Sequence, residues 1–210
     1  MELYLKNDDY KNINIDKLVI KDNDDKFQGG TSDVQLYTDH TNDYIFKKIK
    51  DNKVLLYWKD SYEDGIVLLN NEYKYLNLID KYIYFPTLFS CDFNIKTIIL
   101  SYVGNNIFKT NNIPIDWKTQ LKNIYNILQK YDIYHNDIFE GNICILDNRI
   151  SLIDFGQAST GMPNYPWFNL SLEVIDNSDT IYEMCEKILK SGLNIIAGLY
   201  TRNKTDNRIN

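Results

Sequence analysis

The sequence feature that most constrains the fold is a pair of short apolar runs joined by a polar turn, inside residues 134–159. The first run, ICIL at 143–146, has the residue types of a buried strand, and the second run follows at 150–153. Between them, DNR at 147–149 supplies the turn formers that a tight hairpin needs. The pattern therefore predicts a buried β-hairpin in the second half of the chain.

Three oxygen-bearing side chains flank this predicted hairpin. Asn142 and Asp154 stand at its two ends, 12 residues apart in the sequence, and the hairpin would bring them close together. Asp137 lies five residues before Asn142 in a polar turn, where Gly141 leaves room for the backbone. Carboxylate and amide oxygens suit Mg²⁺, which keeps several waters and usually shares its site with phosphates. The sequence thus predicts a magnesium site at the open end of the hairpin.

Composition bounds what else the chain can be. With 210 residues, of which 44% are hydrophobic, the chain can bury a core as one domain or as two small lobes. The formal net charge of −6 argues against a general nucleic-acid binder, although it leaves room for a local basic groove. The abundance of Asn, Ile, Lys, Tyr and Asp is typical of an AT-rich genome, such as that of a large DNA virus.

The cysteines and the apolar runs indicate where the protein works. Cys91, Cys144 and Cys185 are odd in number and widely spaced, which disfavours a disulfide framework or a zinc site and fits a reducing compartment. Residues 1–20 lack the apolar core of a signal peptide, and no run approaches the roughly 20 apolar residues that a membrane span needs. We expect an intracellular, cytoplasmic protein without a membrane span.

The rest of the chain alternates between strand and helix patterns. Period-two alternation with turn residues predicts strands, and apolar residues that recur every three or four positions predict amphipathic helices. Few firm signals occur at 51–66, and the last ten residues have the character of a polar, frayed tail. The predicted strands fall at 13–20, 34–38, 44–49, 88–93 and 97–103, and the predicted helices at 67–83, 116–130 and 180–189, with Asp116 capping the second helix.

The motifs HND-x4-N and IDFG, at residues 135–142 and 153–156, resemble the catalytic loop and the metal-binding motif of the protein-kinase-like superfamily. The resemblance implies that Asp137 orients the hydroxyl of the acceptor and receives its proton. It also implies that Asn142 and Asp154 bind Mg²⁺ on the nucleotide. The alternative is a polar hairpin without a catalytic role, because a lone DFG means little and Asp and Asn are abundant in this chain.

The resemblance extends into the first half of the chain. QGGTSDV at 28–34 is similar to the glycine-rich loop of the family, so Gly29, Gly30 and Val34 would contact ATP, with Val34 covering the adenine. Lys47 in YIFKKIK matches the strand lysine of VAIK, which would contact the α- and β-phosphates. The alternatives are a plain hairpin turn and an ordinary exposed strand lysine.

Two further parts of the family's nucleotide site have counterparts. Glu72 matches the helix glutamate that pairs with the strand lysine, and Glu63 is a rival with poorer downstream spacing. A solvent-exposed helix glutamate is the alternative for Glu72. Leu100 matches the gatekeeper, and the backbone groups of Ser101 and Val103 would hydrogen-bond to adenine.

Several positions depart from the family pattern. Gln28 and Asp33 replace two glycines of the loop, and a carboxylate at Asp33 would repel a triphosphate. Asn136 replaces the arginine that reads activation-loop phosphates, so we expect no such switch. Phe139 occupies the place of a lysine in serine/threonine kinases. His135, by the family pattern, braces the loop through hydrogen bonds and takes no part in the reaction.

Together these matches imply an α+β, bilobal protein-kinase-like fold, with a β-rich lobe that contains one helix over residues 1–103 and a reduced, mainly helical lobe over 104–210. We expect an ATP-dependent phosphotransferase, a serine/threonine protein kinase that uses ATP and Mg²⁺. Only 54 residues follow Gly156, which is similar to minimal kinases of the RIO and lipopolysaccharide-kinase types. The alternatives are a small-molecule kinase of the same fold and a catalytically weak pseudokinase that acts as a binding scaffold.

Overall fold

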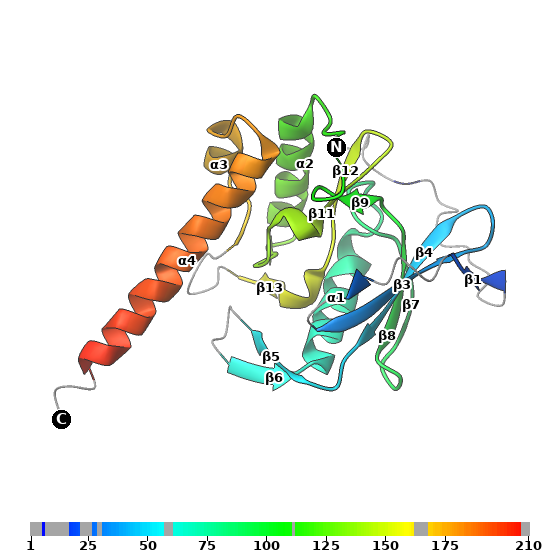
Figure 1. The fold of residues 1–210 in the computed structure, drawn as a ribbon, viewed down its shortest axis with the longest axis horizontal. Helices are drawn as coiled ribbons and strands as arrows, with labels where there is room; N and C mark the ends of the chain where they lie inside the picture. The colour runs from blue at the N-terminus through cyan, green and yellow to red at the C-terminus, as the bar shows by residue number, and fades with distance from the viewer. Residues whose placement is uncertain are drawn as a thin grey trace.

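A computed structural model of the chain describes residues 6, 17–21, 27–28, 31–56, 61–110, 112–161 and 168–206. Within these ranges the chain forms antiparallel sheets and four α-helices, so the predicted α+β class is confirmed. Figure 1 shows the largest sheet with α1 on one side of the molecule, and α2, α3 and α4 with a short hairpin on the other.

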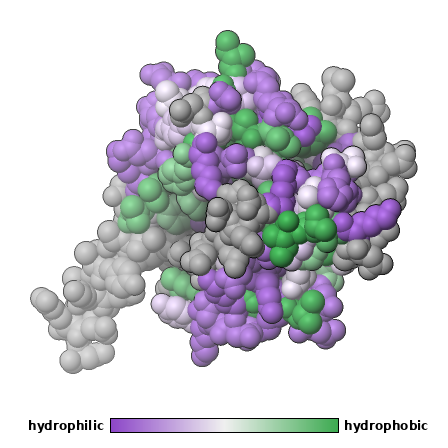
Figure 2. Space-filling view, turned by 45° about the vertical axis from the view of Figure 1, so that its right-hand side comes forward, coloured by the Kyte–Doolittle hydropathy of each residue, from purple (hydrophilic) through white to green (hydrophobic). Residues whose placement is uncertain are grey.

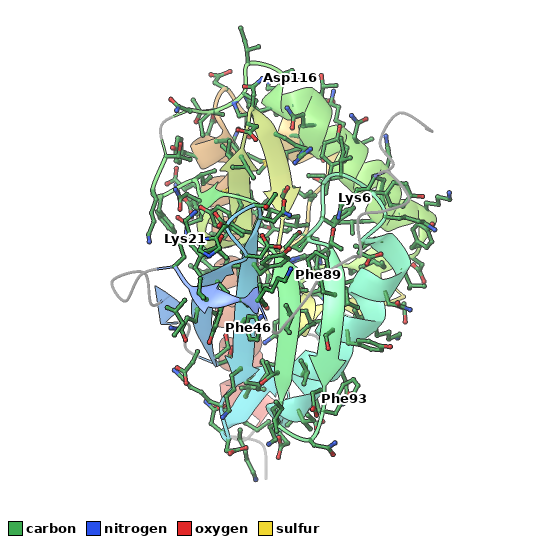
Figure 3. The ribbon with its side chains drawn as sticks, turned by 90° about the vertical axis from the view of Figure 1, so that its right-hand side faces the viewer. Lys6, Lys21, Phe46, Phe89, Phe93 and Asp116 are labelled. Carbon is green, nitrogen blue, oxygen red and sulfur yellow. The ribbon has the colours of Figure 1, made fainter. Side chains whose placement is uncertain are left out.

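The largest sheet is antiparallel and has six strands in the order β1-β3-β4-β8-β7, with β2 paired to the first half of β3. Side chains alternate between the two faces of a strand, so Lys47 in β4 shares the inner face with Ile45 and Ile49. Figure 3 looks onto the opposite face, where Phe46 and Phe89 lie over the strands. The strands are β1 (Val19–Ile20), β2 (Phe27–Gln28), β3 (Ser32–Thr38), β4 (Asp43–Ile49), β7 (Leu88–Asp92) and β8 (Thr97–Ser101).

The predicted strands of this sheet are found close to their expected positions. The differences at 44–49, 88–93 and 97–103 are one or two residues at the ends of the strands. Of the edge strand predicted over 13–20, the structure has Val19–Ile20 as β1, and residues 13–16 lie outside the described residues.

The helix α1, Ile66–Ile79, packs on β4, β7 and β8 and carries Glu72 on its buried face. It ends four residues before the predicted boundary at 83, where Tyr82, Tyr84 and Phe85 are buried in the core of the protein instead. The apolar pattern continues past the helix because these aromatic side chains remain buried after the backbone has turned.

A hairpin of β5 (Lys53–Leu56) and β6 (Ser61–Asp64) precedes α1, in the region where the sequence gave few firm signals. The strand β6 reads SYED, and every residue in it is exposed or only partly buried. A strand without an apolar face lacks the alternation by which strands are recognised. Its partner β5 supplies Val54 and Leu56, which form a small separate cluster with Leu68 of α1.

The remaining elements surround the predicted β-hairpin. The strands β11 (Ile143–Leu146) and β12 (Arg149–Leu152) pair as expected, and β9 (Asn105–Asn106) adds a third strand beside β11. The other elements are α2 (Trp117–Lys130), β10 (Ile133–Tyr134), the 3₁₀ turns η3 (Glu140–Asn142) and η4 (Phe155–Gln157), β13 (Ser159–Thr160), α3 (Leu172–Asp176) and α4 (Ile181–Asp206).

The helix α2 begins and ends as predicted, but Asp116 does not cap it. The Asp116 carboxylate makes no side-chain capping bond and instead accepts a hydrogen bond from Nε2 of Gln120 at 2.9 Å. The same Gln120 amide donates to the carbonyl of Asn148 and accepts from the N–H of Ile150. Gln120 is buried, and the hydrogen bonds of its amide group connect α2 to the β11–β12 hairpin.

The helix α4 is longer than predicted and continues to Asp206, so the frayed tail predicted for the last ten residues is wrong at least to that residue. Figure 1 shows its C-terminal half projecting away from the rest of the molecule. Within the described residues, no helix combines the length and the apolar character that crossing a bilayer demands.

One continuous core joins the two sides of the molecule. It contains residues of β4, α1 and β8, and also of α2, β11, β12, α3 and α4. The division of the chain at residues 103 and 104 therefore stays a prediction, because no break in the core marks it. The face drawn in Figure 2 is largely hydrophilic, with scattered hydrophobic residues between the charged ones.

The connection at Gly104 gives a test of this packing. Its φ of 100° lies in the left-handed region, and an added Cβ would stand 2.0 Å from the carbonyl oxygen of Ile145. We expect Gly104→Ala to lower the free energy of unfolding by about 3 kcal/mol through strain and overlap together. Gly161→Ala is the matched control, because Gly161 has a φ of 75° and open space around it, and should cost about 1 kcal/mol. Equal losses in urea unfolding would contradict the close approach of the two backbones.

Candidate functional site

A cavity of about 680 Å³ lies between the inner face of the main sheet and the loop that carries Asp137, a size typical of small-molecule sites. Nine of the residues predicted for the nucleotide and metal sites line it, from β3, β4, α1, the end of β8 and the segment after it, and from the loop and hairpin that follow α2. These are Val34, Lys47, Glu72, Leu100, Ser101, Val103, Asp137, Asn142 and Asp154.

Lys47 is the centre of the site. Its Nζ atom lies 2.7 Å from Oε2 of Glu72 and 2.7 Å from Oδ1 of Asp154. Lys47 and Glu72 are almost fully buried, whereas the side chain of Asp154 is 37% exposed toward the cavity. The predicted pairing of Lys47 with Glu72 is present, and Glu63, the rival, lies in β6 away from the cavity lining.

The pKa values of Lys47, Glu72 and Asp154 depend on one another. Burial would lower the pKa of Lys47, but Asp154 and Glu72 outweigh burial and raise it. Burial likewise opposes the charge of Asp154, yet Lys47 holds the pKa of this carboxyl below its ordinary value. Burial raises the pKa of Glu72 to about 6, against the opposing effect of Lys47. The result at neutral pH is a lysine cation with one fully enclosed carboxylate and one that faces the cavity.

The backbone at Asp154 adopts a left-handed conformation, with φ 63° and ψ 72°, which is uncommon for residues other than glycine, although aspartate adopts it more readily than most. Contacts around the following turn hold it there. Nδ2 of Asn71 in α1 donates to the carbonyl of Gly156 at 2.8 Å, and Phe155 packs edge-on against Phe85. A Cβ at Gly156 would meet Leu68 at 3.2 Å, so α1 lies directly on this turn.

Asp137 and Asn142 form the second group of the site. Nδ2 of Asn142 donates to both the backbone carbonyl and the carboxylate of Asp137, each at 2.9 Å. Burial and the nearby Asp154 raise the pKa of Asp137 to about 7, although the bond from Asn142 and the charge of Lys47 act in the other direction. This carboxyl therefore titrates near neutral pH, which is where a group that exchanges protons with a substrate works best.

The residues present fit a magnesium ion. The amide nitrogen of Asn142 is taken by Asp137, which leaves its oxygen for a cation, and the carboxylate of Asp154 is partly open to the same cavity. In the described parts of the chain, no group of three or more His, Cys, Asp or Glu side chains is placed to hold a metal. Two oxygen ligands with the remaining positions left to water and phosphate are the arrangement that Mg²⁺ usually takes.

His135 braces the site from behind. It is 1% exposed, packs edge-on against Phe155, and its Nε2 lies 2.9 Å from the carbonyl oxygen of Ile153. A carbonyl can only accept, so Nε2 carries the proton and Nδ1 is left without a partner among the described residues. Burial lowers the pKa of His135 to about 4. The ring is therefore neutral at neutral pH, and its hydrogen bond holds the backbone just before Asp154.

The end of β8 modifies one prediction. The N–H of Ser101 donates to the carbonyl of Thr87 at 3.0 Å, so it is not available to a ligand. Thr87 in turn donates its own N–H to Oγ of Ser101 at 2.8 Å. The N–H of Val103 donates to no other described residue, and Val103 lines the cavity. Of the two backbone groups of Ser101, only the carbonyl therefore remains available for the predicted hydrogen bond to adenine.

The glycine loop can be judged only in part, because Gly29 and Gly30 lie outside the described residues. Val34 lines the cavity from β3 as predicted. Asp33 alternates to the other face of the strand, where its side chain is 67% exposed and its carboxylate lies 3.3 Å from Nζ of Lys50. Asp33 is therefore not among the residues that line the cavity, and the predicted repulsion of a triphosphate stays a prediction.

Sequence reasoning did not assign Asn71, Asn136 or Asn169 a role in building the site, although their amides bind the loops that carry the functional groups. Asparagine is common throughout this chain, so no composition signal marks these three. No protein-family model matches the chain, and no curated protein matches its sequence. The site geometry is therefore the basis for any functional conclusion.

The buried ion pair gives a prediction for stability. Lys47→Met should lower the free energy of unfolding by about 3–5 kcal/mol, because it leaves the enclosed carboxylate of Glu72 without a counter-charge. Lys47→Met combined with Glu72→Met should recover most of this loss in urea unfolding, since the charge is then removed with its partner. A single-variant loss no larger than about 0.5 kcal/mol, as at a surface site, would contradict the pairing.

Acid sensitivity gives a second prediction. As the pH falls below about 6.5, the unfolded chain takes up a proton on His135, whereas burial excludes that proton from the folded state until about pH 4. His135 alone should therefore lower folded stability by about 3 kcal/mol across this window, while Asp137 and Glu72, whose pKa values are raised in the folded state, act in the opposite sense. His135→Gln should flatten this part of the pH profile measured by urea unfolding. Parallel profiles for the native chain and His135→Gln would contradict the neutral, buried ring.

Proposed function

We propose that this protein is an ATP-dependent phosphotransferase with a bilobal, protein-kinase-like arrangement, which transfers the γ-phosphate of ATP to a hydroxyl group. The observation that carries the proposal is the meeting in one cavity of Lys47, Glu72 and Asp154 with Asp137 and Asn142. Phosphoryl transfer asks a protein mainly to position its substrates and to neutralise charge, and these five groups supply both.

Nucleotide binding follows from the shape and chemistry of the cavity. Val34, Ile45 and Leu100 give it an apolar end that suits adenine, beside the carbonyl of Ser101 and the N–H of Val103. At the other end, the ammonium group of Lys47 is held in place by two carboxylates and faces the position of the phosphates. The ordering of Lys47 before ATP arrives reduces the entropy that binding would otherwise cost.

Asn142 and Asp154 are the residues that would hold Mg²⁺. When bound, the ion would neutralise charge on the β- and γ-phosphates. The two residues flank the β11–β12 hairpin at its open end, and the pairing of the strands fixes their separation. The left-handed turn at Asp154, fastened by Asn71 to α1, directs the carboxylate to the cavity.

Asp137 orients the acceptor hydroxyl and receives its proton. The bonds from Asn142 fix the carboxylate, and its pKa of about 7 lets it accept a proton near neutral pH. A serine or threonine side chain of a protein is the acceptor that we propose first. A small molecule is the second candidate, because Phe139 places an aromatic ring at the cavity wall beside Asp137, and that ring lies against Gly141.

ATP with Mg²⁺ should raise the melting temperature of the purified chain and should support transfer of labelled phosphate to a protein or metabolite panel. Asp137→Asn should reduce the transfer rate by about 10²–10⁴-fold while ATP still stabilises the fold, because only proton transfer and acceptor orientation are lost. Asp154→Ala should abolish transfer and the dependence on Mg²⁺ together. Asp176→Asn, at an exposed aspartate of α3, is the matched control and should behave like the native chain.

The possible outcomes separate the alternatives. ATP binding with no transfer to any acceptor would favour a binding scaffold over an enzyme. Neither stabilisation nor transfer would remove the nucleotide proposal entirely. Full transfer by Asp154→Ala would show that the assignment of Asp154 to the metal ion is wrong.

A further inference from the structure

The loop that carries Asp137 is held by a short segment that no sequence motif marks. Phe168 and Asn169 lie shortly before α3, about thirty residues after Asp137 in the chain. We refer to these two residues as the 168–169 clamp. Its contacts concern the two backbone positions on either side of Asp137.

Both neighbours of Asp137 donate their backbone N–H groups to this clamp. The N–H of Asn136 donates to Oδ1 of Asn169 at 2.8 Å, and the N–H of Ile138 donates to the carbonyl of Phe168 at 2.7 Å. Fixing the peptides before and after a residue fixes the direction in which its side chain leaves the backbone. The clamp thus determines where the Asp137 carboxylate points.

The side chain of Asn136 also forms a hydrogen bond with Asn169. Nδ2 of Asn169 donates to Oδ1 of Asn136 at 2.8 Å, so the two asparagines are joined by two hydrogen bonds. Nδ2 of Asn136 donates to the carbonyl of Gln157 and to Oγ of Ser159, each at 3.0 Å. Every hydrogen-bonding group of this side chain is used, and a single buried amide links the clamp, the Asp137 loop and the chain that follows Asp154.

The backbone of Asn136 needs this support. Its φ of 62° is left-handed, and the residue is 1% exposed. A side chain in this conformation carries a conformational cost, which the surrounding bonds must outweigh. All partners of Asn136 in this network are uncharged, so its hold on the loop depends on neither a phosphate group nor a protonation state.

The helix α4 sets the position of the clamp. Phe168 also has a left-handed φ, of 46°, and its ring lies over Gly192 of α4. A Cβ on Gly192 would stand 2.4 Å from Cε1 of that ring, so only glycine at this position allows the ring to lie where it does. The path from α4 to Asp137 therefore runs through one ring contact and one backbone hydrogen bond.

We propose that Asn169 and Phe168 are positioning residues for phosphoryl transfer, acting through Asn136 and Ile138 to orient Asp137, and that α4 holds them in place without any covalent switch. The role of Asp137 rests on the proposed function, whereas the clamp itself is a property of the fold. A misplacement of a catalytic group by about 1 Å can lower a rate by about 10²-fold, so loss of the clamp should appear mainly in kcat.

Asn169→Ala removes both amide contacts to Asn136. We expect kcat to fall by about 10–100-fold, with the KM for ATP within about twofold of the native value. Asn169→Asp keeps an acceptor for the N–H of Asn136 but loses the donor to its side chain, so its loss should be smaller. Asn177→Ala makes the same change at an exposed asparagine after α3 and should leave kcat unchanged.

Gly192→Ala tests the clamp from the other side. A glycine-to-alanine change in a helix normally raises stability, yet here the added methyl group should displace Phe168 and lower kcat. Amide hydrogen exchange provides the readout that does not depend on activity. The N–H groups of Asn136 and Ile138 should exchange faster in Asn169→Ala and Gly192→Ala, respectively, than in the native chain.

The results decide between a positioning and a merely structural role. If Asn169→Ala lowers the melting temperature but transfers phosphate at the native rate per folded molecule, the proposal is overturned. Unchanged exchange at Asn136 and Ile138 in the variants would overturn it as well, even for a variant that fails to transfer. If the native chain transfers no phosphate, the proposed function fails, and the exchange data alone judge whether the clamp holds the loop.

Discussion

The enclosed contact of Lys47 with Glu72 and Asp154 is the interaction on which the site depends. It joins β4 to α1 and to the residue that precedes η4. Along the chain, Glu72 is 25 residues and Asp154 is 107 residues from Lys47. Removing charges from water is costly, and an apolar trio of similar volume would stabilise the fold as well or better. The presence of such a charged group at a cavity supports the proposed phosphotransferase.

Neutral contacts make that charged contact possible. Asn71 fastens α1 to the turn after Asp154, and Gln157 Nε2 donates to the carbonyl of Leu55 in β5 at 2.9 Å. The ring of Phe155 packs edge-on against both Phe85 and the imidazole of His135, so these rings bury one another beside the charged group. The rigid surroundings keep the ionised groups in one geometry, which lets electrostatic attraction offset their desolvation.

The sequence predicted the elements well where a pattern is local. The strands β3, β4, β7 and β8, the helices α1 and α2 and the β11–β12 hairpin follow from periodicity and turn residues, and the spacing of Asp137, Asn142 and Asp154 indicated one site. It failed at β6, whose residues have no apolar face, and at Asp116, whose carboxylate is taken by Gln120 rather than by the helix N-terminus. At β6 the pairing with β5 forms the strand without an apolar signal, and at Asp116 a side chain four residues further along the same helix takes the carboxylate.

What the sequence alone determined is the order of the main strands and helices and which of their side chains share a face, because backbone periodicity is encoded in neighbouring residues. What only the tertiary structure decided is the choice of partners. Asp33 is directed to Lys50 and away from the cavity, the N–H of Ser101 is taken by Thr87, and Asn136 is joined to Asn169. These contacts depend on how distant segments meet, and a chain rich in asparagine and aspartate offers many candidate partners at every position. Packing selects one partner from that set, since a buried polar group must be matched in three dimensions.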